Sequence, residues 1–137
     1  MFRHDYTAAN FEQSPLMFYY EVTQACDLVC QHCRASAQAA ADPRELSTEQ
    51  SLALLDQVAK FPKMPTVVFT GGDPLKRADL LTLIRHGAGL GLQMALTPSA
   101  TPLATRDALG AAKAAGITAL GISLDGSDAG VHDAFRG

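Results

Sequence analysis

The sequence predicts an α/β fold of the partial TIM-like barrel type, in which about four βα units are present. Short apolar runs alternate with helical stretches, as in parallel strands joined by right-handed crossovers. The last three strands begin about 26 residues apart, which is the length of one βα unit. The first, third and fourth strands each have one apolar face and one small or polar face, whereas strands of a doubly wound sheet are apolar on both faces.

Four strands are predicted from runs rich in β-branched, aromatic and aliphatic residues. In the fourth, Ser123 lies on the face that would line the barrel, and Leu124 lies on the face that would meet helices. The first βα unit is longer than the others because a loop with three cysteines follows its strand. The predicted strands are Met17–Thr23, Thr66–Thr70, Leu92–Thr97 and Ile117–Leu124.

Four helices are expected between and after these strands. The first opens with a capping-box pattern from Ser47 to Gln50. The second is expected to stop at Gly87 and Gly89. The third is expected to begin with Thr101 as its N-cap and a proline in its first turn. The expected helices are Ser47–Phe61, Ala78–His86, Thr101–Gly116 and one that begins near Ser127.

Composition limits the class of protein. The 137 residues are 47% hydrophobic and 18% charged, which is ordinary for a globular protein. We expect one core domain at residues 14–137, after an N-terminal extension at residues 1–13. A net charge of −3 without a basic run argues against nucleic acid or a membrane as partner. No apolar stretch is long enough to cross a bilayer or to act as a secretory signal, so we expect a cytoplasmic protein.

All three cysteines of the chain fall within eight residues, with the spacing Cys-x3-Cys-x2-Cys at Cys26, Cys30 and Cys33. An odd, bunched set is unsuited to disulfides and indicates a metal site. The loop follows a parallel strand, at the end of the barrel where such enzymes keep their chemistry. Three thiolates can hold three irons of a cubane and leave the fourth iron open, whereas most electron-transfer clusters have four cysteine ligands.

Other interpretations of these cysteines remain open on the residues alone. One is a non-enzymatic zinc-binding module, with His32 or a distant histidine as fourth ligand. The place of His32 between two cysteines disfavours it as a ligand of the same ion. Another is a flavodoxin-like protein of four units in which the cysteines have no special role.

The cysteine loop resembles the motif of the radical S-adenosylmethionine (SAM) superfamily. The resemblance implies that Cys26, Cys30 and Cys33 hold a [4Fe–4S] cluster whose open iron binds SAM. Reductive cleavage of SAM would give methionine and a 5′-deoxyadenosyl radical that abstracts hydrogen from a substrate. It also implies a barrel of six βα units and an electron donor such as flavodoxin or ferredoxin. His32 stands where the family usually has an aromatic residue.

The segment Gly71-Gly72-Asp73-Pro74 resembles the Gly-Gly-Glu-Pro segment of this family, whose backbone meets the SAM amino group. The glycines would let the backbone approach SAM closely, and Asp73 replaces the commoner glutamate. The alternative is a plain turn in which Asp73 caps the next helix.

Hydroxyl groups after the third strand are candidate contacts of the SAM ribose. Thr97 and Ser99 are the two candidates, whereas Thr101 is assigned the capping role described above.

The end of the chain resembles the Ser-Leu-Asp-Gly…His-Asp…Arg-Gly stretch of radical SAM proteins that carry a C-terminal SPASM extension. In those relatives the strand serine and the helix arginine lie near the SAM carboxylate, which implies this role for Ser123 and Arg136. Asp125 is a further candidate, or it caps the following turn. The alternatives are a buried hydroxyl bonded to the backbone for Ser123 and an exposed surface cation for Arg136.

The run Ser14-Pro15-Leu16 and the segment Tyr20–Thr23 are similar to the branch that contains haem-biosynthesis proteins and peptide-modifying maturases. This similarity suggests modification of a peptide or a tetrapyrrole. Substrate contacts and auxiliary cluster ligands of the family lie on later units. We therefore expect the 137-residue chain to be part of a longer protein and not to turn over by itself.

Overall fold

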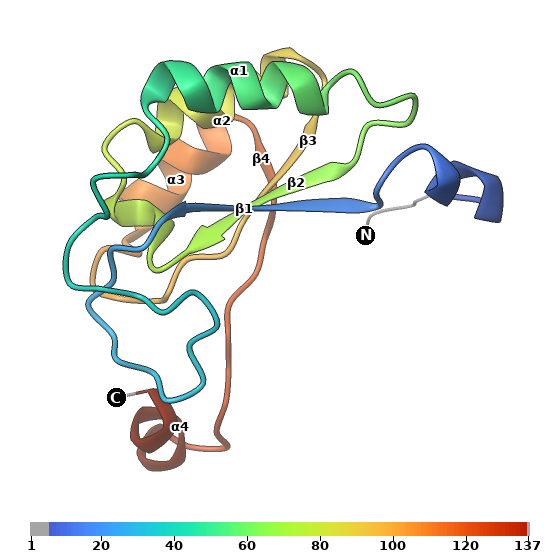
Figure 1. Cartoon of the computed structure of the whole chain (residues 1–137). Coiled ribbons are helices and arrows are strands. Elements are labelled where there is room, and N and C mark those ends of the chain that lie inside the picture. Colours follow the sequence, from blue (N-terminus) through green and yellow to red (C-terminus); the bar gives the residue numbers. More distant parts are fainter. Residues whose placement is uncertain (1–5, 137) are drawn as a thin grey trace.

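The computed structural model describes residues 6–136, and its four strands form one parallel sheet in the order β1-β2-β3-β4 (Figure 1). Strand order therefore follows the chain without reversal, as in a barrel. A doubly wound sheet reverses its order at a switch point, so this topology contradicts the flavodoxin-like alternative. The bounds are β1 Met17–Thr23, β2 Thr66–Gly71, β3 Gln93–Leu96 and β4 Ile117–Leu120.

Three helices lie on one face of the sheet, and a fourth lies apart from them, beside the loop that follows β1 (Figure 1). None of the helices in the described part of the chain is long and apolar enough to cross a membrane. The three covering helices are α1 Thr48–Val58, α2 Leu80–Gly89 and α3 Arg106–Ala115. The separate helix is α4 Ala129–Arg136, and the two 3₁₀ turns are η1 Ala8–Glu12 and η2 Pro74–Lys76.

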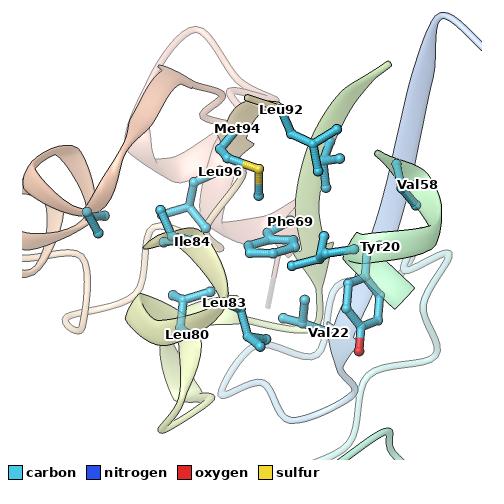
Figure 2. Close-up of a cluster of buried hydrophobic side chains, with 14 residues drawn as sticks. Tyr20, Val22, Val58, Phe69, Leu80, Leu83, Ile84, Leu92, Met94 and Leu96 are labelled. Atoms are coloured by element: carbon cyan, nitrogen blue, oxygen red, sulfur yellow. The ribbon is translucent and has the colours of Figure 1, made fainter. Parts of the chain in front are cut away.

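The hydrophobic core fills the space between the sheet and α1–α3 (Figure 2). Phe69 of β2 is fully buried and meets the ring of Tyr20 edge-on, with ring centroids 5.8 Å apart. Leu83 of α2 and Met94 of β3 are also fully buried around it. Each such side chain contributes about 1.5–3 kcal/mol through removal of apolar surface from water.

The predicted two-faced strands are confirmed for β1 and only partly for β4. In β1, Tyr20 and Val22 are buried, whereas Glu21 is exposed to solvent. The predicted apolar face of the fourth strand is exposed instead, and Leu124 is 82% accessible. The prediction that this strand reaches Leu124 is wrong. The strand ends at Leu120, and the N–H of Gly121 still donates to the carbonyl oxygen of Leu96 in β3 at 2.9 Å.

The capping box of α1 is confirmed, because the Ser47 side chain accepts from the N–H of Gln50 and the Gln50 side chain returns to the Ser47 N–H. Of the two glycines predicted to stop α2, Gly89 is the last residue of the helix, whereas the stop at Gly87 is wrong. The helix continues through Gly87, where an added Cβ would lie 2.5 Å from the Met94 sulfur. This glycine therefore serves a close approach of α2 to β3.

The predicted start of the third helix is also wrong. Helix α3 begins at Arg106, with Thr105 as an N-cap that accepts from the N–H of Ala108 at 3.1 Å. Thr101 instead donates to the buried carboxylate of Asp73 at 2.6 Å. The local pattern of threonine before proline is thus overruled by a contact across 28 residues of sequence.

One buried cation holds several elements together and was not expected from the sequence. The side chain of Arg77 is 8% exposed and donates to the carbonyl groups of Val22 and Leu46 at 2.7 and 2.9 Å. It also donates to the Ser51 hydroxyl and to the carboxylate of Asp79. Arg77 therefore connects the end of β1 to the start of α1.

Candidate cluster and SAM site

A cavity of about 200 Å³ lies where the carboxyl ends of the four strands meet. It is lined by residues from the loops after β1, β2 and β3, from the segment after β4 and from α4. A larger hollow of about 340 Å³ between α3 and β4 is lined mainly by aliphatic side chains and contains none of the predicted site residues. Of the predicted residues, the smaller cavity is lined by Cys26, Cys30, Cys33, Gly71, Gly72, Ser99, Ser123 and Arg136.

The cysteines are free thiols, and their sulfur atoms accept hydrogen bonds from the protein. The N–H of Leu28 donates to Sγ of Cys26, and the N–H of Ala37 donates to Sγ of Cys33, each at 3.4 Å. Cys26 is buried, whereas Cys30 and Cys33 are half-buried and open to the cavity. Hydrogen bonds to sulfur stabilise the thiolate form that binds iron.

A single zinc ion and a cubane require different spacings of three cysteine sulfurs. Within residues 6–136, no three His, Cys, Asp or Glu side chains converge tightly enough to hold one metal ion. Sulfurs on a single zinc lie about 2.3 Å from the metal and hence about 4 Å from one another. A cubane offers each cysteine a separate iron and needs wider spacing. Cys26, Cys30 and Cys33 line one cavity, so three thiolates from a single loop are available there to a bound metal group.

The two glycines after β2 let its backbone pack against the backbone that leads into the cysteine loop. Gly71 has a φ of +133°, and an added Cβ would lie 2.3 Å from the carbonyl oxygen of Thr23. At Gly72 an added Cβ would lie 2.5 Å from the carbonyl oxygen of Ala25. A side chain at either position would therefore displace the residues just before Cys26.

Asp73 and Pro74 are buried beside the cavity and do not line it. The Asp73 carboxylate accepts from the N–H of Leu75 at 3.1 Å and from the hydroxyl of Thr101 at 2.6 Å. This is the turn-capping arrangement that the sequence left as an alternative. These two hydrogen bonds fix the Asp73 side chain and thereby stabilise the turn that follows Gly71 and Gly72.

The two candidate hydroxyls after β3 point to different places. Thr97 donates to the carbonyl oxygen of Phe69 at 3.2 Å and does not line the cavity. Ser99 lines the cavity and donates to the carbonyl oxygen of Gly72 at 2.5 Å, and the Cys26 thiol donates to its hydroxyl at 3.5 Å.

Arg136 is held inside the site rather than on the open surface. Its side chain is 13% exposed, and its guanidinium donates to the Asp125 carboxylate at 2.7 Å and to Sγ of Cys30 at 3.8 Å. Burial opposes the charge, but the hydrogen bonds to Asp125 and Cys30 raise the pKa of Arg136 above its usual value. Asp125 thus orients Arg136, and Ser123 lies nearby on the cavity wall.

Two contributions to the site were missed by the sequence reasoning. Phe135 stacks on the ring of His32, with centroids 4.2 Å apart and an interplanar angle of 16°, so α4 contacts the cysteine loop directly. Glu45 accepts from the hydroxyl of Thr23 and the N–H of Gln24 and thereby fixes the start of the loop. His32 stands where the family usually has an aromatic residue, and this could have indicated the stacking contact. No local sequence pattern indicates the role of Glu45.

The parallel α/β fold places three cysteines around one cavity at the carboxyl end of its strands, where barrel enzymes keep their active sites. The sequence pattern of the Radical SAM superfamily matches residues 20–137. The chain therefore belongs to the radical SAM superfamily, whose enzymes use a [4Fe–4S] cluster and SAM as cofactors. This result confirms the resemblance, the enzyme class and the cofactors expected from the cysteine motif.

Two curated relatives illustrate the branch. The chain is 46% identical over 120 residues to an AdoMet-dependent heme synthase of Oleidesulfovibrio alaskensis, which covers 86% of this chain and 30% of the relative. It is 35% identical over 123 residues to a PqqA peptide cyclase of Rhodopseudomonas palustris, which covers 90% of this chain and 32% of the relative. The chain thus spans about a third of the length of these relatives. Both names fit the expected branch.

A solved structure confirms the fold. Streptococcus suis SuiB bound to the precursor peptide SuiA superposes with a TM-score of 0.70 at 19% identity. The match covers 90% of this chain and 27% of SuiB. At this level of identity the likeness establishes the shared fold alone.

Proposed function

We propose that this chain carries the cluster-binding and SAM-binding part of an enzyme that cleaves SAM reductively and modifies a tetrapyrrole. The observation that carries the proposal is the single cavity in which Cys26, Cys30 and Cys33 meet the glycine segment, Ser123 and Arg136. When bound, the cluster supplies the electron that splits SAM into methionine and a 5′-deoxyadenosyl radical for hydrogen abstraction. Residues 14–137 would belong to the radical SAM core domain and residues 1–13 to an extension before it.

The chain's own residues have distinct roles in this proposal. The three cysteines hold three irons, and N–H donors to their sulfurs stabilise the thiolates. The backbone of Gly71 and Gly72 faces the cavity and receives the SAM ammonium. Arg136 keeps its charge and directs it toward the SAM carboxylate, because a planar guanidinium matches that group.

A tetrapyrrole is favoured as substrate because the 46% identity to an AdoMet-dependent heme synthase extends over most of the chain. We further propose a cytoplasmic location, which the sequence predicts, and an electron donor such as flavodoxin or ferredoxin, which the resemblance to the family implies. Peptide modification is the second candidate, supported by the 35% identity to a PqqA peptide cyclase.

Anaerobic reconstitution tests the cluster. We expect about four irons and four sulfides per chain, with a brown chromophore, because one cubane has that composition. Cys30→Ala should lose the chromophore, whereas Gln31→Ala, which changes an exposed residue between the ligands, should keep it. Stoichiometric zinc without a chromophore would establish the zinc-binding alternative instead.

Calorimetry with SAM tests the second half of the proposal on reconstituted protein. Arg136→Gln should weaken SAM binding by about ten-fold or more, because a charge-assisted pair is worth about 1.5–3 kcal/mol. Arg106→Gln changes an arginine at the start of α3, outside the cavity, and serves as the control. Equal SAM affinity of the two variants would remove Arg136 from the SAM site.

Because substrate contacts of the family lie on later βα units, the substrate test uses cluster-loaded protein that includes those units. Binding of an iron tetrapyrrole to this protein can be followed by its absorption spectrum. A spectral shift with saturable affinity supports the tetrapyrrole assignment. No shift, together with saturable binding of a precursor-type peptide, would favour the second candidate.

A further inference from the structure

The hydroxyl of Ser99 joins two parts of the site that belong to different loops. It donates to the carbonyl oxygen of Gly72 at 2.5 Å, and it accepts from the thiol of Cys26 at 3.5 Å. In the metal-free protein, Cys26 is therefore the donor to Ser99, and Ser99 is the donor to Gly72. This chain of hydrogen bonds connects the cysteine loop to the glycine segment.

Binding of iron removes one proton from the hydrogen bonds that link Cys26, Ser99 and Gly72. A cysteine that ligates iron has lost its thiol proton, which is released to solvent. The Cys26 sulfur is then an acceptor only, and Ser99 has one hydroxyl proton for two acceptors. A hydrogen bond to an anionic sulfur is charge-assisted, whereas one to the Gly72 carbonyl is neutral. The hydroxyl is thereby drawn toward Cys26 once the thiolate forms.

The surroundings favour this rearrangement. Cys26 as a residue is 7% exposed, so its surroundings are mostly protein, and a protein donor to its sulfur has more effect there than in solvent. The recorded donor to this sulfur is the backbone N–H of Leu28 at 3.4 Å. Rotation about one side-chain bond would let the Ser99 hydroxyl act as a second donor. Thr97, two residues earlier, is committed to the carbonyl oxygen of Phe69.

We propose that Ser99 is a positioning residue that donates a hydrogen bond to the Cys26 thiolate in the cluster-loaded protein and thereby raises the reduction potential of the cluster. The physical reason is that reduction adds negative charge to the cluster, and hydrogen bonds to its sulfurs stabilise that charge. No covalent bond is made or broken in this rearrangement, and the electron comes from the external donor. The inference rests on the proposed function, because it requires the cluster.

Redox titration of reconstituted protein tests this role. The reduction potential of the cluster is measured anaerobically with mediator dyes, and the reduced cluster is quantified by its EPR signal at matched iron content. Ser99→Ala should shift the potential to a more negative value, and Ser99→Thr, which keeps a hydroxyl, should restore it toward the wild-type value. Thr118→Val is the matched control, because the Thr118 hydroxyl donates to the carbonyl oxygen of Met94 outside the cavity.

The outcomes separate this inference from the proposed function. An unchanged potential in Ser99→Ala, with normal iron content, overturns the inference. If that variant also loses SAM affinity, Ser99 is the ribose contact that the sequence suggested. Where Ser99→Ala fails to take up iron, Ser99→Gly replaces it, and iron loss in both variants overturns the tuning role. A wild-type chain without any cluster would refute the proposed function itself.

Discussion

The sheet with its three covering helices and the segment from β4 to α4 are held in place by different forces. In the first region, side chains such as Phe69 and Leu83 are fully buried, so removal of apolar surface from water dominates. In the second, none of the residues of α4, all of which the structure describes, is buried. Its recorded contacts with the cysteine loop are those of Phe135 with His32 and of Arg136 with Cys30.

The difference teaches that the stability of the fold and the completeness of the site are largely separate properties of this chain. The core positions the cysteine loop and the glycine segment at one end of the sheet. Helix α4 then completes the cavity with Arg136, through contacts to the site itself. Changes in the two regions should therefore have distinguishable effects.

The largest effect on stability is expected from Phe69→Ala. This substitution should lower the free energy of unfolding by about 3–5 kcal/mol, because it leaves a cavity among fully buried neighbours. Leu124→Ala, at an 82% exposed position beyond β4, should change it by less than about 0.5 kcal/mol. Urea denaturation measures both values, and equal losses would contradict the contrast between the two regions.

Arg77→Ala should lower the free energy of unfolding by about 2–4 kcal/mol, because it leaves the carbonyl groups of Val22 and Leu46 without their donor. Arg85→Ala, on an exposed face of α2, is the matched control. Thermal unfolding followed by circular dichroism provides the measurement. Equal melting temperatures in the two variants would mean that Arg77 does not connect β1 to α1 energetically.

A smaller, pH-dependent effect is expected from Asp79. The hydrogen bond from Arg77 outweighs partial burial and lowers the pKa of Asp79 below its usual value. A lowered folded-state pKa adds stability above the unfolded pKa near 4, and that stability is lost as the pH falls through the folded pKa. Because the carboxylate is partly open to solvent, we expect about 1 kcal/mol or less.

Unfolding of wild type and Asp79→Asn in urea at pH 7 and pH 3 measures this contribution. The difference in stability between the two proteins should be larger at pH 7 and should shrink toward pH 3. A constant difference would show that the ionisation of Asp79 does not contribute.

The smallest global effect is expected from Phe135→Ala. We expect a change of less than about 0.5 kcal/mol in overall unfolding, because α4 lies outside the core. Amide exchange in α4 should nevertheless become faster, since the stacking contact with His32 is lost. Phe135→Tyr should keep slow exchange. Unchanged exchange in Phe135→Ala would show that the stack does not hold α4 on the cysteine loop.

The cysteine site was largely predictable from the sequence, and its details were not. The spacing of Cys26, Cys30 and Cys33 is local, and parallel strands bring their carboxyl ends to one edge, so the meeting of these loops could be foreseen. The burial and the contacts of each candidate residue could not be predicted. Asp73 is fully buried next to the glycine segment. Arg136 contacts Cys30, which is 106 residues away in the sequence.

What the sequence by itself determined was the order of strands and helices, the capping box at Ser47 and the cysteine motif. These features depend on neighbours within about one turn or one strand, so periodicity and spacing are sufficient to predict them. Only the tertiary structure decided that Thr101 bonds to Asp73 and that α2 continues through Gly87. The reason is physical: a buried carboxylate must find a donor and packed elements must fit, and both partners are set by the fold rather than by adjacent residues.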